Sequence, residues 1–451
     1  MEEMLSNIVI PKNITIYSKN QNKIIFNPET VSWLKVDEME YKMFLDLKDN
    51  SYNNLENELD EKIKGFIFKL VIEKIIYVGN NPNIHFKEVK PKLTVYYSPT
   101  ETCNLRCLYC YADANSVIDN PICTYLKEDT IKAKEIITQI TDTDAEQIVF
   151  TGGEPLLRKD IFELAIFAKS KGLKTAILTN GTLINDSNYF NFKCFDYVKM
   201  SLDSSEPEIN DSTRGLGTFK KVINAVKLLK SIDIDIRLAS VITKRNMEYM
   251  EELVNFMEKE LDVKNHNIST HISQGRGKVD NLECSCDEVL EFRRKYINAK
   301  LSSKNIKNMT SLLQPMIKRH VARKHCGAGV KEIYINSKGE VFPCRLMYEN
   351  EHCLGNLFEI KLKEILKTKK LKDIQNMVYV ENITTCKGCE IKYICGGGCR
   401  HTHSCYTGSL TETNSDLCKI LKNEIEDMLW IDSNINPTNG LPLEVNLKAN
   451  V

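Results

Sequence analysis

The chain carries no excess of charge of either sign. Its 451 residues include 61 Lys plus Arg and 61 Asp plus Glu, which gives a formal net charge of +0. Proteins that bind nucleic acid or anionic membranes through long-range electrostatics carry an excess of positive charge. We therefore expect no nucleic-acid partner, and any partner must be recognised by local features of the chain.

Long apolar runs are also missing. No segment of the sequence approaches the roughly 18 uninterrupted apolar residues of a membrane-spanning helix, so we expect no membrane span. The opening residues MEEMLSNIVIPKN are acidic where a secretory signal is basic, and a long apolar stretch does not follow them. We therefore expect a cytoplasmic protein.

Cysteine, in contrast, is abundant, with 16 residues. In a reducing compartment such cysteines are metal ligands more often than disulfides. Hydrophobic residues make up 42% of the chain and charged residues 27%, as in a folded globular protein, and the length suggests two or three domains.

Three of the cysteines stand within eight residues of the segment SPTETCNLRCLYCYAD. Cys103, Cys107 and Cys110 are separated by three and two residues, a spacing that is neither a zinc-finger pair nor a common ferredoxin run. Three thiolates on a short loop can hold three corners of a cubane iron–sulfur cluster, which leaves one iron open to a small molecule. Zinc remains an alternative if a fourth ligand comes from elsewhere.

Strand and helix patterns alternate along the middle of the chain. Apolar segments at 93–98, 147–153, 175–181, 197–203 and 236–242 predict strands, and residues 128–140, 159–172, 219–232 and 247–261 predict helices. Such alternation indicates a parallel sheet with helices outside and functional residues at the carboxyl ends of the strands. A less regular segment follows at about 281–322.

Residues 1–92 form a separate pattern. Segments 13–19 and 22–28 predict a hairpin, 36–49 a helix, and 63–79 a helix that runs into a strand. This order suits a winged-helix unit, and an ordinary extension packed on the main domain is the alternative.

CNLRCLYC resembles the CxxxCxΦC signature of the radical S-adenosylmethionine (SAM) enzymes, in which Φ is aromatic. Further motifs follow in the family's order: TGGEP at 151–155, LTNGT at 178–182, SLDS at 201–204, RG at 214–215, SVI at 240–242 and QGRG at 274–277. The resemblance covers roughly residues 93–280. It implies an α/β fold with a partial (β/α)6 TIM-like barrel, in which reductive cleavage of SAM yields a 5′-deoxyadenosyl radical that abstracts hydrogen from the substrate.

The resemblance also implies the site residues. The catalytic cluster would be held by Cys103, Cys107 and Cys110. The SAM contacts would be Tyr109, Gly152, Gly153, Glu154, Asn180, Ser201, Asp203, Arg214, Val241 and Ile242. Among these, Glu154 matches the segment that meets the methionine amino group, and Arg214 matches the usual partner of the SAM carboxylate.

A second group of cysteines resembles the SPASM extension, which usually carries two auxiliary [4Fe–4S] clusters. Its seven positions are Cys326, Cys344, Cys386, Cys389, Cys395, Cys399 and Cys418. The resemblance assigns Cys326, Cys344 and Cys399 to the first auxiliary cluster and the other four to the second, so three [4Fe–4S] clusters are expected in all. A zinc ribbon is the alternative.

Some members of the family have an eighth cysteine where this chain has His320. The first auxiliary cluster is then expected to keep an open iron, unless His320, His325 or Cys353 fills it. An open iron could bind a thiolate of the substrate.

The N-terminal pattern resembles the PqqD-like leader-recognition domains of peptide maturases. We therefore expect a winged-helix peptide-recognition domain at 1–92, a radical SAM core at 93–300, a bridging region at 301–325, an iron–sulfur SPASM domain at 326–430 and a tail at 431–451. The predicted reaction forms a thioether from a cysteine of a ribosomally made precursor peptide, as in sactipeptide maturases of bacteriocin biosynthesis. Flavodoxin or ferredoxin would donate the electron.

Other functions remain open. A carbon–carbon crosslinking or epimerising peptide maturase, or an enzyme like the anaerobic sulfatase maturases, would share the barrel and the cluster ligands. A zinc-structured peptide adaptor is the alternative from a different class.

Overall fold

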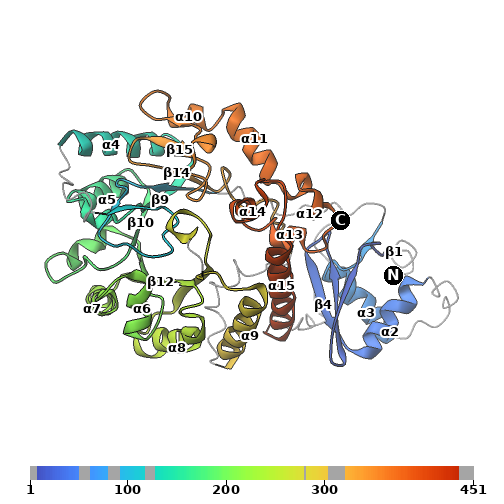
Figure 1. Ribbon diagram of the computed structural model, residues 1–451. Coiled ribbons are helices and arrows are strands. Elements are labelled where there is room, and N and C mark those ends of the chain that lie inside the picture. Colours follow the sequence, from blue (N-terminus) through green and yellow to red (C-terminus); the bar gives the residue numbers. More distant parts are fainter. Residues whose placement is uncertain are drawn as a thin grey trace.

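A single sheet of nine strands runs through the larger part of the described molecule (Figure 1). The computed structural model describes residues 8–49, 61–79, 92–116, 127–278, 281–302 and 320–435. Six neighbouring strands are parallel, in the order β13-β12-β11-β10-β9-β6. Their bounds are Leu93–Tyr97 (β6), Ala145–Phe150 (β9), Lys174–Thr179 (β10), Tyr197–Ser201 (β11), Asp235–Ile242 (β12) and Asn265–Thr270 (β13).

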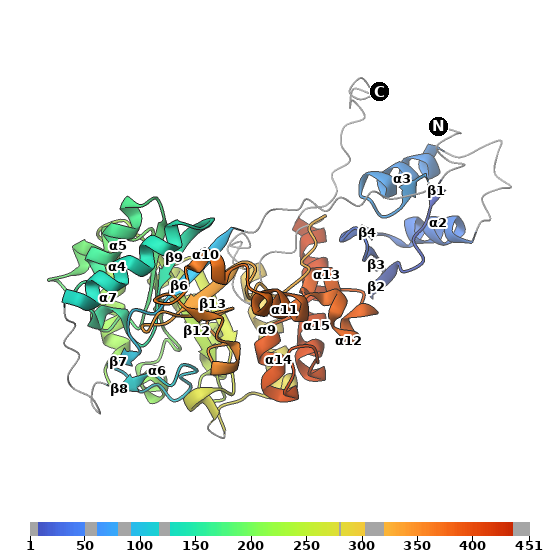
Figure 2. The same cartoon turned by 90° about the horizontal axis from the view of Figure 1, so that it is seen from above.

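Helices cover one face of these strands, as Figures 1 and 2 show for α4, α5 and α7, while α6 and α8 follow β11 and β12 in the chain. Their bounds are Lys127–Thr141 (α4), Ile161–Ser170 (α5), Pro207–Arg214 (α6), Thr218–Lys230 (α7) and Met250–Asn255 (α8). Side chains such as Ile148, Val198 and Leu238 on the covered face are fully buried in one large core. The predicted partial (β/α)6 barrel is therefore confirmed, and so are its five predicted strands.

The cysteine-rich region continues the same sheet. β14 (Glu332–Ile335) lies parallel to β6, with Tyr334 opposite Tyr96, and β15 (Glu340–Phe342) and β16 (Gly355–Asn356) follow in antiparallel order. Helices follow at Leu362–Ile365 (α10), Lys369–Val378 (α11), Thr384–Lys387 (α12), Lys392–Cys395 (α13), Arg400–Thr407 (α14) and Ser415–Ile435 (α15). The cluster region is thus attached directly beside the strand that precedes Cys103.

The segment at about 281–322, predicted to be less regular, includes one long helix. It contains α9 (Cys286–Ser302), which packs beside α15. Residues 436–451, most of the predicted tail, lie outside the described residues, as does Cys123. Within the described ranges, no helix has both the length and the apolar character needed to cross a membrane.

The N-terminal residues form a small unit of sheet and helices. β2 (Thr15–Lys19), β3 (Asn22–Asn27) and β4 (Ser32–Val36) make an antiparallel sheet, followed by α2 (Glu38–Lys48) and α3 (Glu61–Ile72), while β1 (Ile8–Val9) pairs with β5 (Tyr77–Val78). The hairpin, both helices and the closing strand are as predicted, but β4 was missed. The winged-helix assignment itself stays a prediction.

The N-terminal sheet is buried on both faces. Ile25 and Leu34 face α2 and α3, whereas Trp33 shares an apolar cluster with Leu429 and Trp430 of α15. β4 accordingly lies beside α15 in Figure 1. The unit is therefore docked on the C-terminal cysteine-rich region.

Candidate functional site

Cys103, Cys107 and Cys110 lie on the segment after β6, called the cysteine loop, in which the short strand β7 (Thr102–Cys103) pairs with β8 (Asn115–Ser116). The end of β9 holds this loop. Gly153 donates its backbone N–H to the carbonyl of Thr100 (3.0 Å), and Glu154 donates to that of Thr102 (2.9 Å). A Cβ atom on Gly153 would lie 2.2 Å from the Thr102 carbonyl oxygen, and one on Gly152 would lie 2.2 Å from that of Thr100. Both glycines are thus required by the chain's own loop.

The three thiols are close enough to influence one another electrostatically. Burial raises the pKa of Cys103 to about 12; the backbone N–H of Leu105 opposes this shift, and the charges of Glu154, Cys107 and Cys110 add to it. Three thiolates in this position need a compensating positive charge, which iron supplies when it binds sulfur. The donor set therefore fits an iron–sulfur cluster.

A single metal ion fits these three cysteines less well than an iron–sulfur cluster does. Among the described residues, no three His, Cys, Asp or Glu side chains lie close enough together to hold one ion. In a cubane each iron takes one thiolate, so the ligands stand further apart than around one zinc ion.

Arg276, in the QGRG motif, braces the cysteine loop. Its backbone N–H donates to the carbonyl of Cys110 (3.0 Å), and its guanidinium donates to Asp113 Oδ1 (2.9 Å) and to the carbonyl of Ala114 (2.9 Å). A Cβ atom on Gly275 would lie 2.6 Å from the Cys110 carbonyl oxygen. The motif was recognised in the sequence, but no role was assigned to Arg276.

Glu154 has no exposed surface and is held in one orientation. Thr179 Oγ1 (2.7 Å) and the backbone N–H of Asn180 (2.7 Å) and Leu156 (3.0 Å) all donate to its carboxylate. Burial raises the pKa of Glu154 to about 7, although these three hydrogen bonds oppose the shift. A bound ammonium group would stabilise the ionised form, as predicted for the SAM amino group.

Asp203 and Arg214 form a buried ion pair. Arg214 Nε lies 2.7 Å from Asp203 Oδ2, and Arg214 Nη2 donates to Oδ1 at 2.9 Å. The backbone N–H of Val241 (3.0 Å) and the hydroxyl of Tyr109 also donate to this carboxylate. Burial acts to lower the pKa of Arg214, but the charge of Asp203 outweighs it and the pKa rises. Arg214, predicted to meet the SAM carboxylate, thus has a carboxylate partner within the chain.

The remaining predicted SAM contacts also lie at strand ends. Asn180 follows β10 and donates through Nδ2 to Asn104 Oδ1 (2.8 Å). Ser201 ends β11, while Val241 and Ile242 end β12. These positions share the edge of the sheet from which the cysteine loop emerges.

Cys326, Cys344 and Cys399 are neighbours. Burial raises the pKa of Cys326 to about 11, and the charge of Cys399 adds to this shift. Cys344 likewise has a pKa raised by burial and then by the charges of Glu332 and Cys399. The structure therefore gathers the three cysteines expected around the first auxiliary cluster.

The other four cysteines form a second group. Burial raises the pKa of Cys386, which the charges of Cys389 and Cys418 raise further. Cys395 is affected in the same way by burial and by Cys386. This grouping matches the set expected around the second auxiliary cluster.

The three side chains considered as a fourth ligand of the first auxiliary cluster have other partners. His320 Nδ1 bonds to Ser32 Oγ of the N-terminal unit (3.0 Å), the thiol of Cys353 donates to the carbonyl of Gly355 (3.7 Å), and the ring of His325 packs on another aromatic ring. Cys405 matches none of the sequence motifs. Burial raises the pKa of its thiol, and the charge of the nearby Cys399 raises this pKa further.

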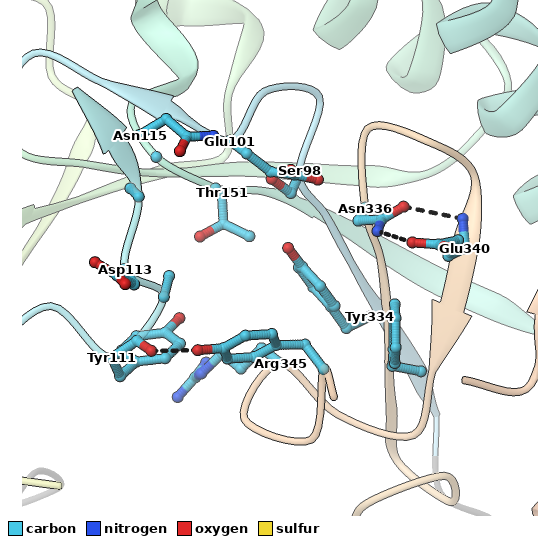
Figure 3. A pocket seen from close by; sticks show the side chains of 16 residues that line it. Ser98, Glu101, Tyr111, Asp113, Asn115, Thr151, Tyr334, Asn336, Glu340 and Arg345 are labelled. Carbon is cyan, nitrogen blue, oxygen red and sulfur yellow. Dashed lines mark hydrogen bonds between the residues drawn. The ribbon is translucent and has the colours of Figure 1, made fainter. Parts of the chain in front are cut away.

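A cavity of about 250 Å³ lies between the cysteine loop and the β14–β15 hairpin. Figure 3 shows Tyr334 and Arg345 from the cysteine-rich region facing Asp113 and Thr151 of the core. Tyr111 and Tyr348 also line it, and the Tyr348 hydroxyl donates to the Tyr111 carbonyl. The cavity is therefore lined by Tyr111 and Arg345, the residues that follow Cys110 and Cys344 in the chain.

Comparisons with known families agree with this layout. The model of the radical SAM superfamily matches residues 97–257, and that of the SPASM iron–sulfur cluster-binding domain matches residues 326–390. The AdoMet-dependent haem synthase of Methanosarcina barkeri is 25% identical over 71% of this chain and 95% of its own length.

Two further proteins are similar over more of the chain. The antilisterial bacteriocin subtilosin biosynthesis protein AlbA of Bacillus subtilis is 28% identical over 80% of this chain and 79% of its own length. The structure of Streptococcus suis SuiB bound to the precursor peptide SuiA covers 91% of this chain and 100% of its own, with a TM-score of 0.56 and 16% identity. The likeness to SuiB shows a shared fold.

Proposed function

Because the chain belongs to the radical SAM superfamily, carries a SPASM domain and uses SAM with iron–sulfur clusters, we propose that it forms a thioether within a ribosomally made precursor peptide. The bond would join a cysteine sulfur of the peptide to a carbon of another residue. Flavodoxin or ferredoxin is the proposed electron donor.

The similarity to AlbA carries this proposal. It extends over four fifths of both chains, which is more of this chain than the haem synthase match covers. The N-terminal unit supports a peptide substrate as well, because an antiparallel sheet can accept an extended leader peptide as an additional edge strand.

We assign the first cluster to Cys103, Cys107 and Cys110. Cys326, Cys344 and Cys399 would hold the first auxiliary cluster, and the second would be held by Cys386, Cys389, Cys395 and Cys418. When bound, SAM and the clusters would supply hydrogen-atom abstraction from the peptide and would take up the electron that thioether formation releases, and the thiol proton would pass to solvent.

The chain's own residues position the reactants in this scheme. Glu154 is fixed by three donors and would hold the SAM ammonium group. The Asp203–Arg214 pair ties α6 to the end of β12 through Val241, and Arg276 fixes the loop that bears Cys110. Such rigid support keeps a reactive radical at a defined distance from the substrate and away from water.

The test is to incubate reconstituted enzyme, SAM and a reductant with a cysteine-containing candidate peptide, to be sought among small reading frames next to this gene. Each thioether removes two hydrogens from the peptide and protects one cysteine from iodoacetamide, both of which mass spectrometry detects. A modified peptide whose cysteines all remain alkylatable would contradict thioether formation and favour a carbon–carbon crosslinker or an epimerase.

The second candidate is a step of haem synthesis. The Methanosarcina haem synthase is matched over nearly its whole length, and this observation favours a small-molecule substrate. Turnover of an iron tetrapyrrole, with no change in the mass of the peptide, would support this candidate.

A further inference from the structure

Three consecutive glycines separate the two sets of auxiliary cysteines in the chain. Gly396, Gly397 and Gly398, called here the glycine turn, stand between Cys395 of the second set and Cys399 of the first. Their φ angles are 66°, 82° and 65°, which lie in the left-handed region that favours glycine. The chain therefore passes from one set of cysteines to the other through a tight turn without side chains of its own.

Two arginines lie against this glycine turn. A Cβ atom on Gly396 would lie 3.1 Å from Arg323 Cβ and 3.6 Å from Arg323 Nε, and one on Gly397 would lie 3.6 Å from Arg400 Cδ. Arg400 is the first residue of α14 and directly follows Cys399. Both arginines are thus placed where the chain crosses between the two sets of cysteines.

Arg400 has no exposed surface and holds three backbone segments together. Its Nη1 donates to the carbonyl of Gly397 (2.9 Å), and its Nη2 donates to that of Glu412. Its Nε donates to the carbonyl of Leu410 (2.7 Å), and the Leu410 side chain shares an apolar cluster with Cys344 of the first set. The guanidinium is therefore fixed in one position beside the first set.

The segment around Glu412 also adjoins the second set of cysteines. Thr413 follows Glu412, and its hydroxyl forms a hydrogen bond of 2.8 Å with the hydroxyl of Thr385, which precedes Cys386. Arg400 is therefore connected through the backbone to segments that carry or adjoin cysteines of both sets.

Neither arginine has a carboxylate partner among the described residues. Burial lowers the pKa of Arg400, and the charge of Cys386 opposes this shift, followed by those of three further cysteines of the two sets. The pKa of Arg323 is likewise lowered by burial, against the charges of Cys395 and Cys326. Because a buried cation is costly without an anion, the cysteine thiolates are the counter-charges that this region provides.

We propose that Arg323 and Arg400 raise the reduction potentials of the two auxiliary clusters and so allow these clusters to take up an electron. Adding an electron makes a thiolate-ligated cluster more negative, and a fixed cation nearby stabilises that reduced form. The arginines act through the clusters and not on the peptide.

This inference rests on the proposed function, because thioether formation requires an electron acceptor. Joining the cysteine sulfur to carbon removes one hydrogen atom, which the radical takes, one proton, which passes to solvent, and one electron. An auxiliary cluster whose potential is raised by nearby cations is a better acceptor for that electron.

A purely structural role for Arg400 is the competing explanation, since its guanidinium holds three carbonyl groups. Loss of the arginine would then reduce the iron content or the stability of the protein, and the potentials of the clusters that still assemble would not change. The reduction potential therefore separates the effect of the charge from that of the hydrogen bonds.

The experiment is an anaerobic redox titration of the full-length reconstituted enzyme, followed by electron paramagnetic resonance. Arg400→Gln and Arg323→Gln should each lower the equilibrium constant for reducing the auxiliary clusters about 10-fold, which corresponds to about 59 mV for one electron. Arg400→Lys keeps the charge and should stay nearer to wild type. The control Lys372→Gln removes an exposed charge on α11 and should titrate like wild type.

Arg323→Gln keeps the proposal testable if Arg400→Gln fails to take up iron, because Arg323 is only half-buried. Unchanged potentials in an iron-loaded glutamine variant, or equal shifts in Arg400→Gln and Arg400→Lys, would overturn the inference. Lowered potentials in an enzyme that forms no thioether would contradict only the proposed function. Thioether formation with potentials that do not respond to either arginine would contradict only the role of the arginines.

Discussion

Arg214 and Asp203 meet in the interior of the barrel through two nitrogen–oxygen contacts of 2.7 and 2.9 Å. Asp203 has no exposed surface, and Arg214 is 6% exposed. The arginine therefore depends on this carboxylate for compensation of its charge.

Asp203→Asn leaves Arg214 buried without its anion. We expect the free energy of unfolding to fall by about 3–5 kcal/mol, since removing one partner of a buried pair strands the other charge. Denaturant titration under anaerobic conditions measures this loss. The control Asp262→Asn breaks the exposed pair with Lys230 and should cost about 0–1 kcal/mol. Equal losses in the two variants would contradict the importance of the buried pair.

Gly153→Ala should displace the cysteine loop. The new Cβ atom would lie 2.2 Å from the Thr102 carbonyl oxygen, so the loop must move away from β9. We expect the variant to lose the first cluster and hence about one third of its iron, while the auxiliary clusters remain. Iron analysis and visible absorption measure this. Gly65→Ala, in α3 with nothing within 4 Å of the new Cβ atom, should keep all its iron.

The sequence predicts five of the six parallel barrel strands because each carries several buried apolar residues, as Ile148, Val149 and Phe150 are in β9. β13 (NHNIST) was not predicted because only His266 and Ile268 lie on its buried face, while its asparagines face the barrel interior. β4 was not predicted because it is buried on both faces, so its sequence lacks the alternation of polar and apolar residues. A strand is hardest to recognise when it has few apolar residues or when burial on both faces removes the polar alternation.

Part of the functional site could likewise be predicted from the sequence, and part could not. Cys103, Cys107 and Cys110 remain neighbours in any fold because one short segment carries them. Cys326, Cys344 and Cys399 are far apart in the sequence, and only the family resemblance predicted their grouping. The pairing of Arg214 with Asp203, and the role of Arg276 beneath Cys110, could not be predicted because they depend on how separate loops pack. Residue type indicates a charge, but only the packed structure shows which charge balances it.

Trp33→Ala should loosen the N-terminal unit from the SPASM region. The indole has no exposed surface and shares an apolar cluster with Leu429 on α15, so we expect a loss of about 3–5 kcal/mol of stabilisation. Hydrogen exchange should accelerate in both β4 and α15. Leu34→Ala acts on the opposite face of the sheet, toward α2 and α3, and should accelerate exchange in those helices instead. Identical exchange patterns for the two variants would refute the separate roles of the two faces.

Lys199 should make stability depend on pH in the alkaline range. Burial of Lys199 on β11 lowers its pKa to about 8 in the folded chain, below the value of about 10.4 in an unfolded chain. Between these values the unfolded chain binds more protons, so the free energy of unfolding should rise with pH from 8 to about 10.4. Below pH 8 the charged lysine costs on the order of 1–3 kcal/mol, a range reduced for screening by solvent. Lys199→Met should therefore be more stable than wild type at pH 7 and equal to it near pH 10.5, whereas exposed Lys221→Met should follow wild type throughout. A wild-type protein no less stable than Lys199→Met at pH 7 would mean that this charge is already balanced within the chain.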